Sequence, residues 1–262
     1  MDVSRQLTTL TRIGFATRGL LYIVIGVLVI RTGRTEDTSG ALEYLGRGGG
    51  QLLLGVMAAG LLAYGVWRLA DTIFNIERHA SDRKGAVERV GAAASGLVHL
   101  LLAWQAVKLL RGVASTGDSA RHGTQIAQNM PGGGTVVGLA GLVLLGVGVF
   151  QLVKAVKGSF LRHLDPRAAR HPVVQWSGRA GYAARGFVFM ITAYFLLRAG
   201  FADEEGAAGG TSQALSWLAN PWDLVVATGL LGFGLFSLVE ARFRRLADVP
   251  VDNVVRKAVS PG

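Results

Sequence analysis

A set of charged and polar residues within or beside long apolar runs is the part of this sequence that could do chemistry. Ionisable groups in an apolar span are candidates for function, because placing a charge in lipid is costly. Such groups could bind an anion, hold a cation or pass a proton. The candidates are Arg12, Arg18, Arg68, Asp71, Arg89, Ser95, His99, Lys154, Arg179, Arg185 and Glu240.

Arg18 and Arg185 follow Arg12 and Arg179 by six residues in the same kind of apolar run. Six helical residues advance by about 9 Å, and an Arg side chain can reach back to the headgroups from that depth. We favour snorkelling or a structural hydrogen bond for both, with an anion or ligand site as the alternative. The glycine that follows each Arg would let a neighbouring helix approach closely.

Three charged residues close equivalent apolar runs, namely Asp71, Lys154 and Glu240. With the basic residues Arg12, Arg89 and Arg179 they predict a polar ring at one end of the helices. We favour a salt-bridge collar that fixes helix packing over a cytoplasmic gate or a proton-handling site. Lys154 interrupts the acidic pattern and weakens any scheme that needs three identical ligands. Arg68 precedes Asp71 by three residues, which predicts a local ion pair.

His99 is the titratable group nearest the middle of an apolar run. Its ordinary pKa would suit proton transfer or metal binding. Its position in the repeated motif is occupied by Tyr22 and Phe189 in the other two copies, so we favour an aromatic packing role. The other histidines fall in loops and the chain has no cysteine, so we expect no metal and no cofactor, because a transition-metal or haem site needs more ligands.

These residues belong to an internal repeat. Arg179–Phe189 matches Arg12–Tyr22, and more weakly Arg89–His99, where Ser95 replaces the second Arg of the motif. The runs that end with the charged residues match as well, as Gly-x-aromatic-x-Leu-x-charge beginning at Gly65, Gly148 and Gly234. We therefore divide a single membrane domain, residues 1–262, into units of about 1–76, 77–165 and 166–245, followed by a short cytoplasmic tail, 246–262.

The composition is that of a membrane protein. Half of the residues are hydrophobic and 17% are charged, against about 25% charged in soluble domains. Six apolar runs are long enough to cross about 30 Å of hydrocarbon as helices, and none alternates with period two. The runs are 13–31, 51–70, 90–110, 135–153, 180–198 and 222–240. We predict an all-α polytopic membrane protein with six transmembrane helices in three parallel two-helix repeats, related by a pseudo-threefold axis along the membrane normal.

The segments between the two runs of each unit predict interfacial half-turns, with plain loops as the alternative. They are 41–45, 125–129 and 214–218, and the nearby Tyr44, Trp217 and Trp222 would lie in the aromatic belt. Glycines in the second run of each unit predict close helix contacts, with a smooth permeation path as the alternative. The first apolar run is similar to a signal peptide, but no cleavage site follows it, so we expect it to remain in the protein as a transmembrane helix.

Lys and Arg are distributed unequally between the predicted loops. The termini and the loops 71–89 and 154–179 carry seventeen of them, whereas the opposite side carries seven. This asymmetry predicts a protein of the cell membrane with both termini in the cytoplasm. The net charge of +10 then points to anionic lipid headgroups at the cytoplasmic face, and to other membrane proteins as further partners, rather than to nucleic acid.

The tandem motif resembles the bacterial family catalogued as domain of unknown function 1206 (DUF1206), whose units open with Arg-x-Gly-Tyr-x-Ala-Arg-Gly. Arg179–Gly186 fits this form, the first unit departs from it at Phe15 and Thr17, and the second departs at Ala92 and Ser95. The resemblance covers nearly the whole chain. It implies a membrane protein of three two-helix units and brings no established activity.

Two classes of function are open. In the first, the chain is a structural or accessory membrane protein that binds lipids or partners, and we favour this class because charge at mid-depth is scarce. In the second, it is a small transporter or channel whose path follows the repeat axis. An enzyme ranks last, because the sequence carries no nucleophile-elbow, zinc-protease or phosphate-loop motif.

Overall fold

A computed structural model describes residues 3–32, 38–47, 50–75, 82–113, 119–201, 211–218 and 221–245. Nearly all of these residues are helical, and they contain no strand beyond an isolated antiparallel bridge between Leu164 and Arg244. The helices are α1 (Val3–Thr32), α2 (Thr38–Arg47), α3 (Gln51–Phe74), α4 (Arg83–Leu110), α5 (Ser119–Gln128), α6 (Gly133–Lys157), η1 (Ser159–His163), α7 (Pro166–Ala169), α8 (Pro172–Phe201), α9 (Thr211–Trp217) and α10 (Trp222–Phe243).

Six of these helices, two from each unit, are long and apolar enough to cross a membrane. The spans are Thr11–Arg31, Gln51–Phe74, Glu88–Leu110, Gly133–Lys157, Pro172–Phe201 and Trp222–Phe243. Each coincides with a predicted run, so the predicted fold class is confirmed for a multi-pass membrane protein. The short helices α2, α5 and α9 occupy the places of the predicted half-turns, and the side chains of Tyr44, Trp217 and Trp222 are exposed.

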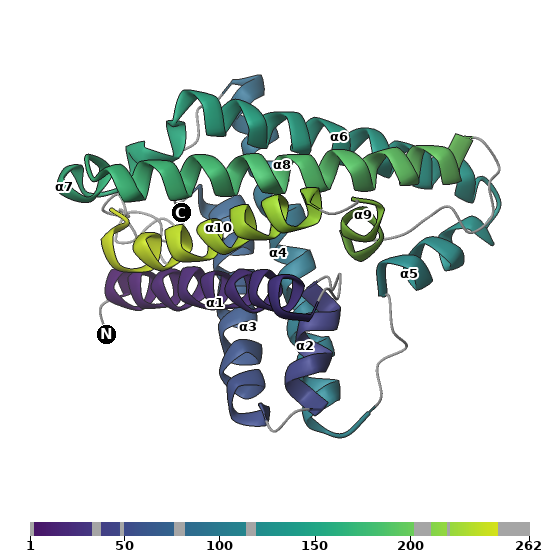
Figure 1. Cartoon of the computed structure of the whole chain (residues 1–262), viewed down its shortest axis with the longest axis horizontal. Helices are drawn as coiled ribbons and strands as arrows, with labels where there is room; N and C mark the ends of the chain where they lie inside the picture. The colour runs from purple at the N-terminus through teal and green to yellow at the C-terminus, as the bar shows by residue number, and fades with distance from the viewer. Residues whose placement is uncertain are drawn as a thin grey trace, which may run out of the picture.

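The most closely packed pairs among the six long helices join different units. α3 of the first unit pairs with α4 of the second, α6 of the second with α8 of the third, and α10 of the third returns to α1. In Figure 1, α1, α10, α8 and α6 run side by side along the long axis, while α3 and α4 cross them steeply. Each unit therefore gives one helix to each of two pairs, and the cycle closes between the first and last long helices.

The same glycine contact recurs in all three pairs. A Cβ at Gly19 would lie 2.8 Å from the carbonyl oxygen of Gly234, one at Gly96 would lie 3.1 Å from that of Gly65, and one at Gly186 would lie 3.0 Å from that of Gly148. Backbones can approach this closely only where both helices lack side chains. The predicted use of these glycines for close helix contact is confirmed, and the repeat extends from sequence to packing.

Contacts within a unit are also repeated, but only in the first and third units. Gly14 is covered by the Tyr64 ring and Gly60 faces Thr17, while Gly181 is covered by Phe233 and Gly229 faces Ala184. These contacts join α1 to α3 and α8 to α10.

The middle unit differs from its neighbours. Gly91, which corresponds to Gly14 and Gly181, has no atom near the place of a Cβ. Val143 stands where the other units have Gly60 and Gly229, and 68% of its surface is exposed. The bulk of this valine opposes the close approach that a glycine permits, and α4 and α6 do not pack against each other as the predicted two-helix hairpin requires.

The helix ends on the predicted cytoplasmic side are defined by local backbone signals. α3 ends at Asn75 and α6 ends at Gly158, both in the left-handed conformation that terminates helices. α4 begins after Asp82, whose carboxylate accepts a hydrogen bond from the Gly85 N–H at 2.8 Å. These ends place Asp71 and Lys154 in the last turn of their helices.

Candidate functional site

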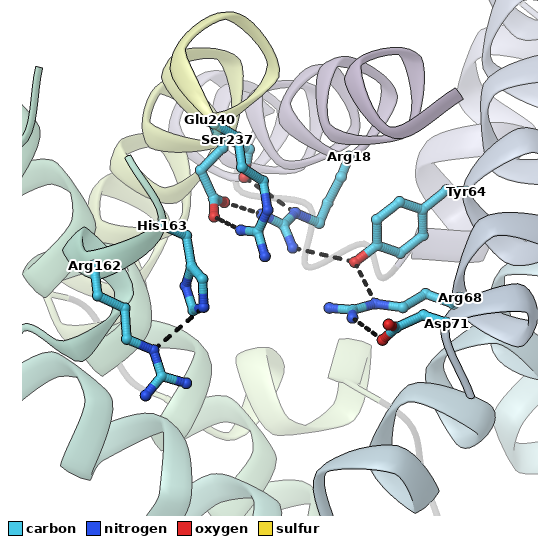
Figure 2. A network of polar contacts seen from close by, with 9 residues as sticks. Arg18, Tyr64, Arg68, Asp71, Arg162, His163, Ser237 and Glu240 are labelled. Carbon is cyan, nitrogen blue, oxygen red and sulfur yellow. Dashed lines mark hydrogen bonds and ion pairs between the residues drawn. The ribbon is translucent and has the colours of Figure 1, made fainter. Parts of the chain in front are cut away.

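Arg18 on α1 is the centre of a buried polar cluster that joins the first and third units. Only 8% of its surface is exposed. Its Nε donates to the Ser237 hydroxyl at 3.2 Å, its Nη1 to the Tyr64 hydroxyl at 3.4 Å, and its Nη2 is ion-paired with the Glu240 carboxylate. Figure 2 shows these side chains converging from α1, α3 and α10. The structural hydrogen-bonding role favoured for Arg18 agrees with this geometry.

Glu240 on α10 holds a second cation. Its Oε1 accepts a hydrogen bond from Nη1 of Arg244 at 2.8 Å, one helical turn further on. The Glu240 side chain is 2% exposed. A carboxylate so deeply buried is stabilised only when paired and hydrogen-bonded, and the guanidinium groups of Arg18 and Arg244 provide both.

Tyr64 extends the cluster towards the end of α3. Its hydroxyl accepts a second hydrogen bond from Nε of Arg68 at 3.2 Å, and Arg68 Nη1 lies 3.7 Å from the fully buried Asp71 carboxylate (Figure 2). The predicted ion pair between Arg68 and Asp71 is present. Tyr64 thus connects the Arg18–Glu240 pair to the Arg68–Asp71 pair.

Aromatic rings fill the space around the guanidinium groups. The Arg18 Cζ lies 4.5 Å from the Phe15 ring centroid and 4.9 Å from that of Phe233. Arg185 also contacts Phe233, at 4.5 Å, and the rings of Tyr22 and Phe189, each at 5.1 Å. Phe233 is fully buried. Arg18 and Arg185 therefore meet on one phenyl ring, held by cation–π attraction.

His99 lies against the same cluster from α4. Its ring centroid is 4.5 Å from that of Tyr64, and its Nδ1 lies 2.6 Å from the carbonyl oxygen of Ser95. That contact requires the proton on Nδ1, since a carbonyl oxygen only accepts. The ring packs as its repeat position predicts. Among the residues that the structure describes, no group of three His, Cys, Asp or Glu is placed to hold a metal ion.

The predicted polar ring, in which Arg12, Arg89 and Arg179 join the charged residues at the helix ends, takes another form. Arg89 donates through Nε and Nη2 to the Thr72 carbonyl oxygen at 3.0 and 2.6 Å, and Arg179 donates to that of Val156 at 3.2 Å. Both guanidinium groups therefore bind the C-terminal carbonyls of the neighbouring helix, where a cation is favoured. Arg12 is exposed, and the cation paired with Glu240 is Arg18, one and a half turns deeper.

Ser95 and Lys154 take the remaining repeat positions. Ser95 contributes its carbonyl to His99, and the Lys154 Nζ lies 4.5 Å from the Phe150 ring centroid. Three members of the site were not predicted from the sequence, namely Tyr64, Ser237 and Arg244. Ser237 was detectable, because the repeat aligns it with Arg68, whereas Tyr64 aligns with Phe233 and Val147 and gives no polar signal.

Comparison with known proteins agrees with the threefold repeat. The family model described as Domain of Unknown Function (DUF1206) matches residues 13–75, 90–158 and 180–244. "Uncharacterized protein YxxB" of Bacillus subtilis (strain 168) is 28% identical to the chain over 248 residues, which cover 90% of each protein. No solved structure matches.

Proposed function

This chain belongs to the DUF1206 family, and from that premise we propose that it is a non-enzymatic accessory protein of the bacterial inner membrane. Both termini lie in the cytoplasm, where its basic face binds anionic lipid headgroups. The observation that carries the proposal is the filled junction of α1, α3 and α10. Arg18 is bound by Glu240, Ser237 and Tyr64, and it lies against the rings of Phe15 and Phe233. A path through this junction would have to break a buried ion pair and displace two aromatic rings.

The basic face consists of two segments that contact each other, the connection between α6 and α8 and the end of α10. The Asp165 N–H donates to the Phe243 carbonyl at 2.9 Å, and the Arg245 N–H donates to the His163 carbonyl at 2.8 Å. The connection between α6 and α8 is therefore adjacent to the end of α10. Their exposed basic residues are Lys157, Arg162, Arg167, Arg170, Arg242 and Arg245. Basic clusters near the membrane surface attract anionic lipid with about 1 kcal/mol per Lys or Arg.

Lipid retention tests this proposal. The protein is purified in detergent, mixed with phosphatidylglycerol or phosphatidylcholine, and analysed by native mass spectrometry. We expect more bound phosphatidylglycerol, and a loss of that preference at high salt, which screens exposed charges. The variant R162Q/R167Q/R170Q should lose most of the preference. The matched variant R31Q/R111Q, which removes cations from the opposite ends of the helices, should keep it. Equal binding of both lipids contradicts the proposal.

A transporter or channel is the second candidate, because three ionisable residues share contacts inside the helix bundle. Arg18 and His99 both contact Tyr64, and Arg18 and Arg185 both contact Phe233. Ionisable groups at such a place are typical of ion and proton pathways. Flux through proteoliposomes distinguishes the two. The accessory function predicts ion and proton flux equal to that of empty vesicles for the wild type. A transport function predicts flux above that level, increased further by Phe233→Ala, which removes the ring between the two arginines.

A further inference from the structure

The connection between α6 and α8 places an aromatic side chain inside the helix bundle, at its predicted cytoplasmic end. Gly158, in the left-handed conformation, caps α6, and the chain continues as the short helix η1. η1 turns Phe160 inward, so that only 3% of its surface is exposed. The Phe160 ring stacks on Tyr182 at a centroid distance of 5.0 Å and meets Phe236 edge-on at 4.9 Å. Phe160 is therefore an anchor that inserts between α8 and α10.

A glycine on α8 makes room for this anchor. A Cβ at Gly178 would lie 2.3 Å from Cε2 of the Phe160 ring, so the ring lies directly against the helix backbone. Leu164, which follows η1, is also 3% exposed and belongs to the same buried cluster as Phe160, Tyr182 and Phe236. The burial of two large apolar side chains stabilises the position of the connection.

The connection is also joined to the end of α10 through the backbone. An antiparallel bridge pairs Leu164 with Arg244, with one hydrogen bond on either side of it. A 2.7 Å contact between the Asp165 carboxylate and the Arg245 guanidinium adds a side-chain link at the surface. An isolated pair of strands is marginally stable in water, and exposed ion pairs contribute little. These contacts therefore depend on the Phe160 anchor.

The two segments that the anchor brings together have the same charge. Their exposed arginines are Arg162, Arg167, Arg170, Arg242 and Arg245. Segments 157–171 and 241–245 contain a single acid, Asp165. Exposed charges within about 10 Å of each other interact at ordinary ionic strength, so these cations repel one another when the segments meet. An anion bound over both segments would relieve this repulsion.

We propose that Phe160 controls the binding of anionic lipid. With the anchor inserted, the connection and the end of α10 form one basic surface, and a phospholipid headgroup bound there stabilises the inserted state. This inference rests on the proposed lipid-binding function and states how that function is controlled. Coupling between two such equilibria is reciprocal, so the inserted anchor raises the affinity for lipid by the same factor by which lipid favours insertion. A substitution that displaces the anchor therefore weakens lipid binding without changing any charge.

The test measures both sides of this coupling in the full-length protein in detergent. Hydrogen exchange of the amides in 158–165 reports the anchor, and native mass spectrometry reports the binding of phosphatidylglycerol, phosphatidylcholine or inorganic phosphate. Phe160→Ala removes the anchor, whereas Gly178→Ala displaces the ring and leaves Phe160 unchanged. The matched controls are Phe187→Ala, which removes an exposed ring from α8, and Gly91→Ala, which adds a Cβ in open space. Alanine is favoured over glycine in helices, so Gly178→Ala keeps the test decisive if Phe160→Ala does not fold.

Phosphatidylglycerol should slow exchange in 158–165 of the wild type, and phosphatidylcholine should not. Phe160→Ala and Gly178→Ala should speed this exchange and lower the apparent affinity for phosphatidylglycerol about fivefold or more, the lower end of typical couplings. Both controls should behave as the wild type does.

The contrary outcomes separate the anchor from the lipid-binding function. Faster exchange with unchanged affinity, or unchanged exchange in both variants, overturns the inference and leaves the lipid-binding function standing. Equal slowing by inorganic phosphate overturns lipid as the ligand and leaves the anchor standing. Absence of any preference of the wild type for phosphatidylglycerol over phosphatidylcholine, with no change in exchange, overturns both.

Discussion

The guanidinium of Arg18 on α1 is ion-paired with the carboxylate of Glu240 on α10, across 222 positions of sequence. This pair closes the cycle of helix pairs, since α10 has no following unit and returns to the first. It lies one residue from Gly19, whose contact with Gly234 brings the two backbones together. Packing and charge therefore act at the same point of the α1/α10 interface.

Removing one partner of this pair should destabilise the protein strongly. Arg18→Gln leaves the Glu240 carboxylate with only Arg244, and breaking a buried pair costs about 3–5 kcal/mol. The measurement is the unfolding free energy in detergent, with the exposed Arg12→Gln as the matched loss of a cation. The apolar triple variant R18M/E240L/R244M, which removes both cations together with the carboxylate, should recover most of the stability. A small effect of Arg18→Gln would show that the pair contributes little.

The glycines of the three between-unit contacts should tolerate no side chain. Gly19→Val and Gly186→Val each place atoms against the partner backbone, which costs about 1–3 kcal/mol from overpacking. Gly91→Val makes the same change on α4, where no atom lies near the added Cβ. Thermal unfolding should separate the first two variants from the third. Three equal losses would mean that helix propensity, not packing, sets the cost.

Engineered cysteine pairs should show in which units the two long helices pack against each other. A Cβ at Gly60 would lie 2.6 Å from that of Thr17, and one at Gly229 would lie 2.6 Å from that of Ala184. A disulfide needs a Cβ–Cβ separation of about 3.5–4.5 Å, so the helices must separate by about 1 Å. We expect T17C/G60C and A184C/G229C to cross-link after this small shift, and the equivalent A94C/V143C to stay reduced. The chain contains no native cysteine, so oxidation followed by gel electrophoresis under denaturing conditions gives a clean answer. Rapid cross-linking of A94C/V143C would show that α4 and α6 close against each other.

Asp165, in the turn between η1 and α7, should titrate below the usual range. The hydrogen bond from Arg245 at 2.7 Å is the main cause, followed by one from the Arg167 N–H, and together they lower the pKa of Asp165. The contact therefore contributes stability above the unfolded pKa, near 4, and that contribution is lost as the pH falls through the lower folded pKa. A carboxyl-carbon NMR titration measures this midpoint, and Arg245→Gln should raise it. An unchanged midpoint in that variant would contradict the assignment.

The repeat predicted the number and type of the long helices, because apolar length and the glycine motif are local properties, but α1 and α8 begin ten and eight residues before their predicted runs. It did not predict which helices pair. Gly65 and Gly96 lie on consecutive spans, whereas Gly19 contacts Gly234 across nearly the whole chain. The local pattern identifies which helix surfaces form close contacts, but the pairing of those surfaces depends on the assembled fold. The open middle unit could have been predicted from Val143, since this valine replaces a glycine that the other units use for close contact.

The charged residues of the site were recognisable individually, and the local Arg68–Asp71 pair was predicted from spacing alone. The predicted polar ring included Arg12, because Arg12 and Glu240 lie at similar distances from their helix ends, but the partner of Glu240 on α1 is Arg18. A long Arg side chain reaches over a turn and a half, so Arg18 rather than Arg12 is the partner. Tyr64 was missed because its hydroxyl matters only where α1 and α3 meet.

The separation of Arg18 from Glu240 has a consequence for biogenesis. Translation at roughly 5–20 residues per second leaves α1 in the translocation machinery or the bilayer on the order of ten seconds or more before α10 is made. During that time the Arg18 guanidinium has no counter-ion from its own chain. The insertion machinery or an anionic phospholipid must shelter it, and nascent chains truncated before residue 240 should be degraded rapidly.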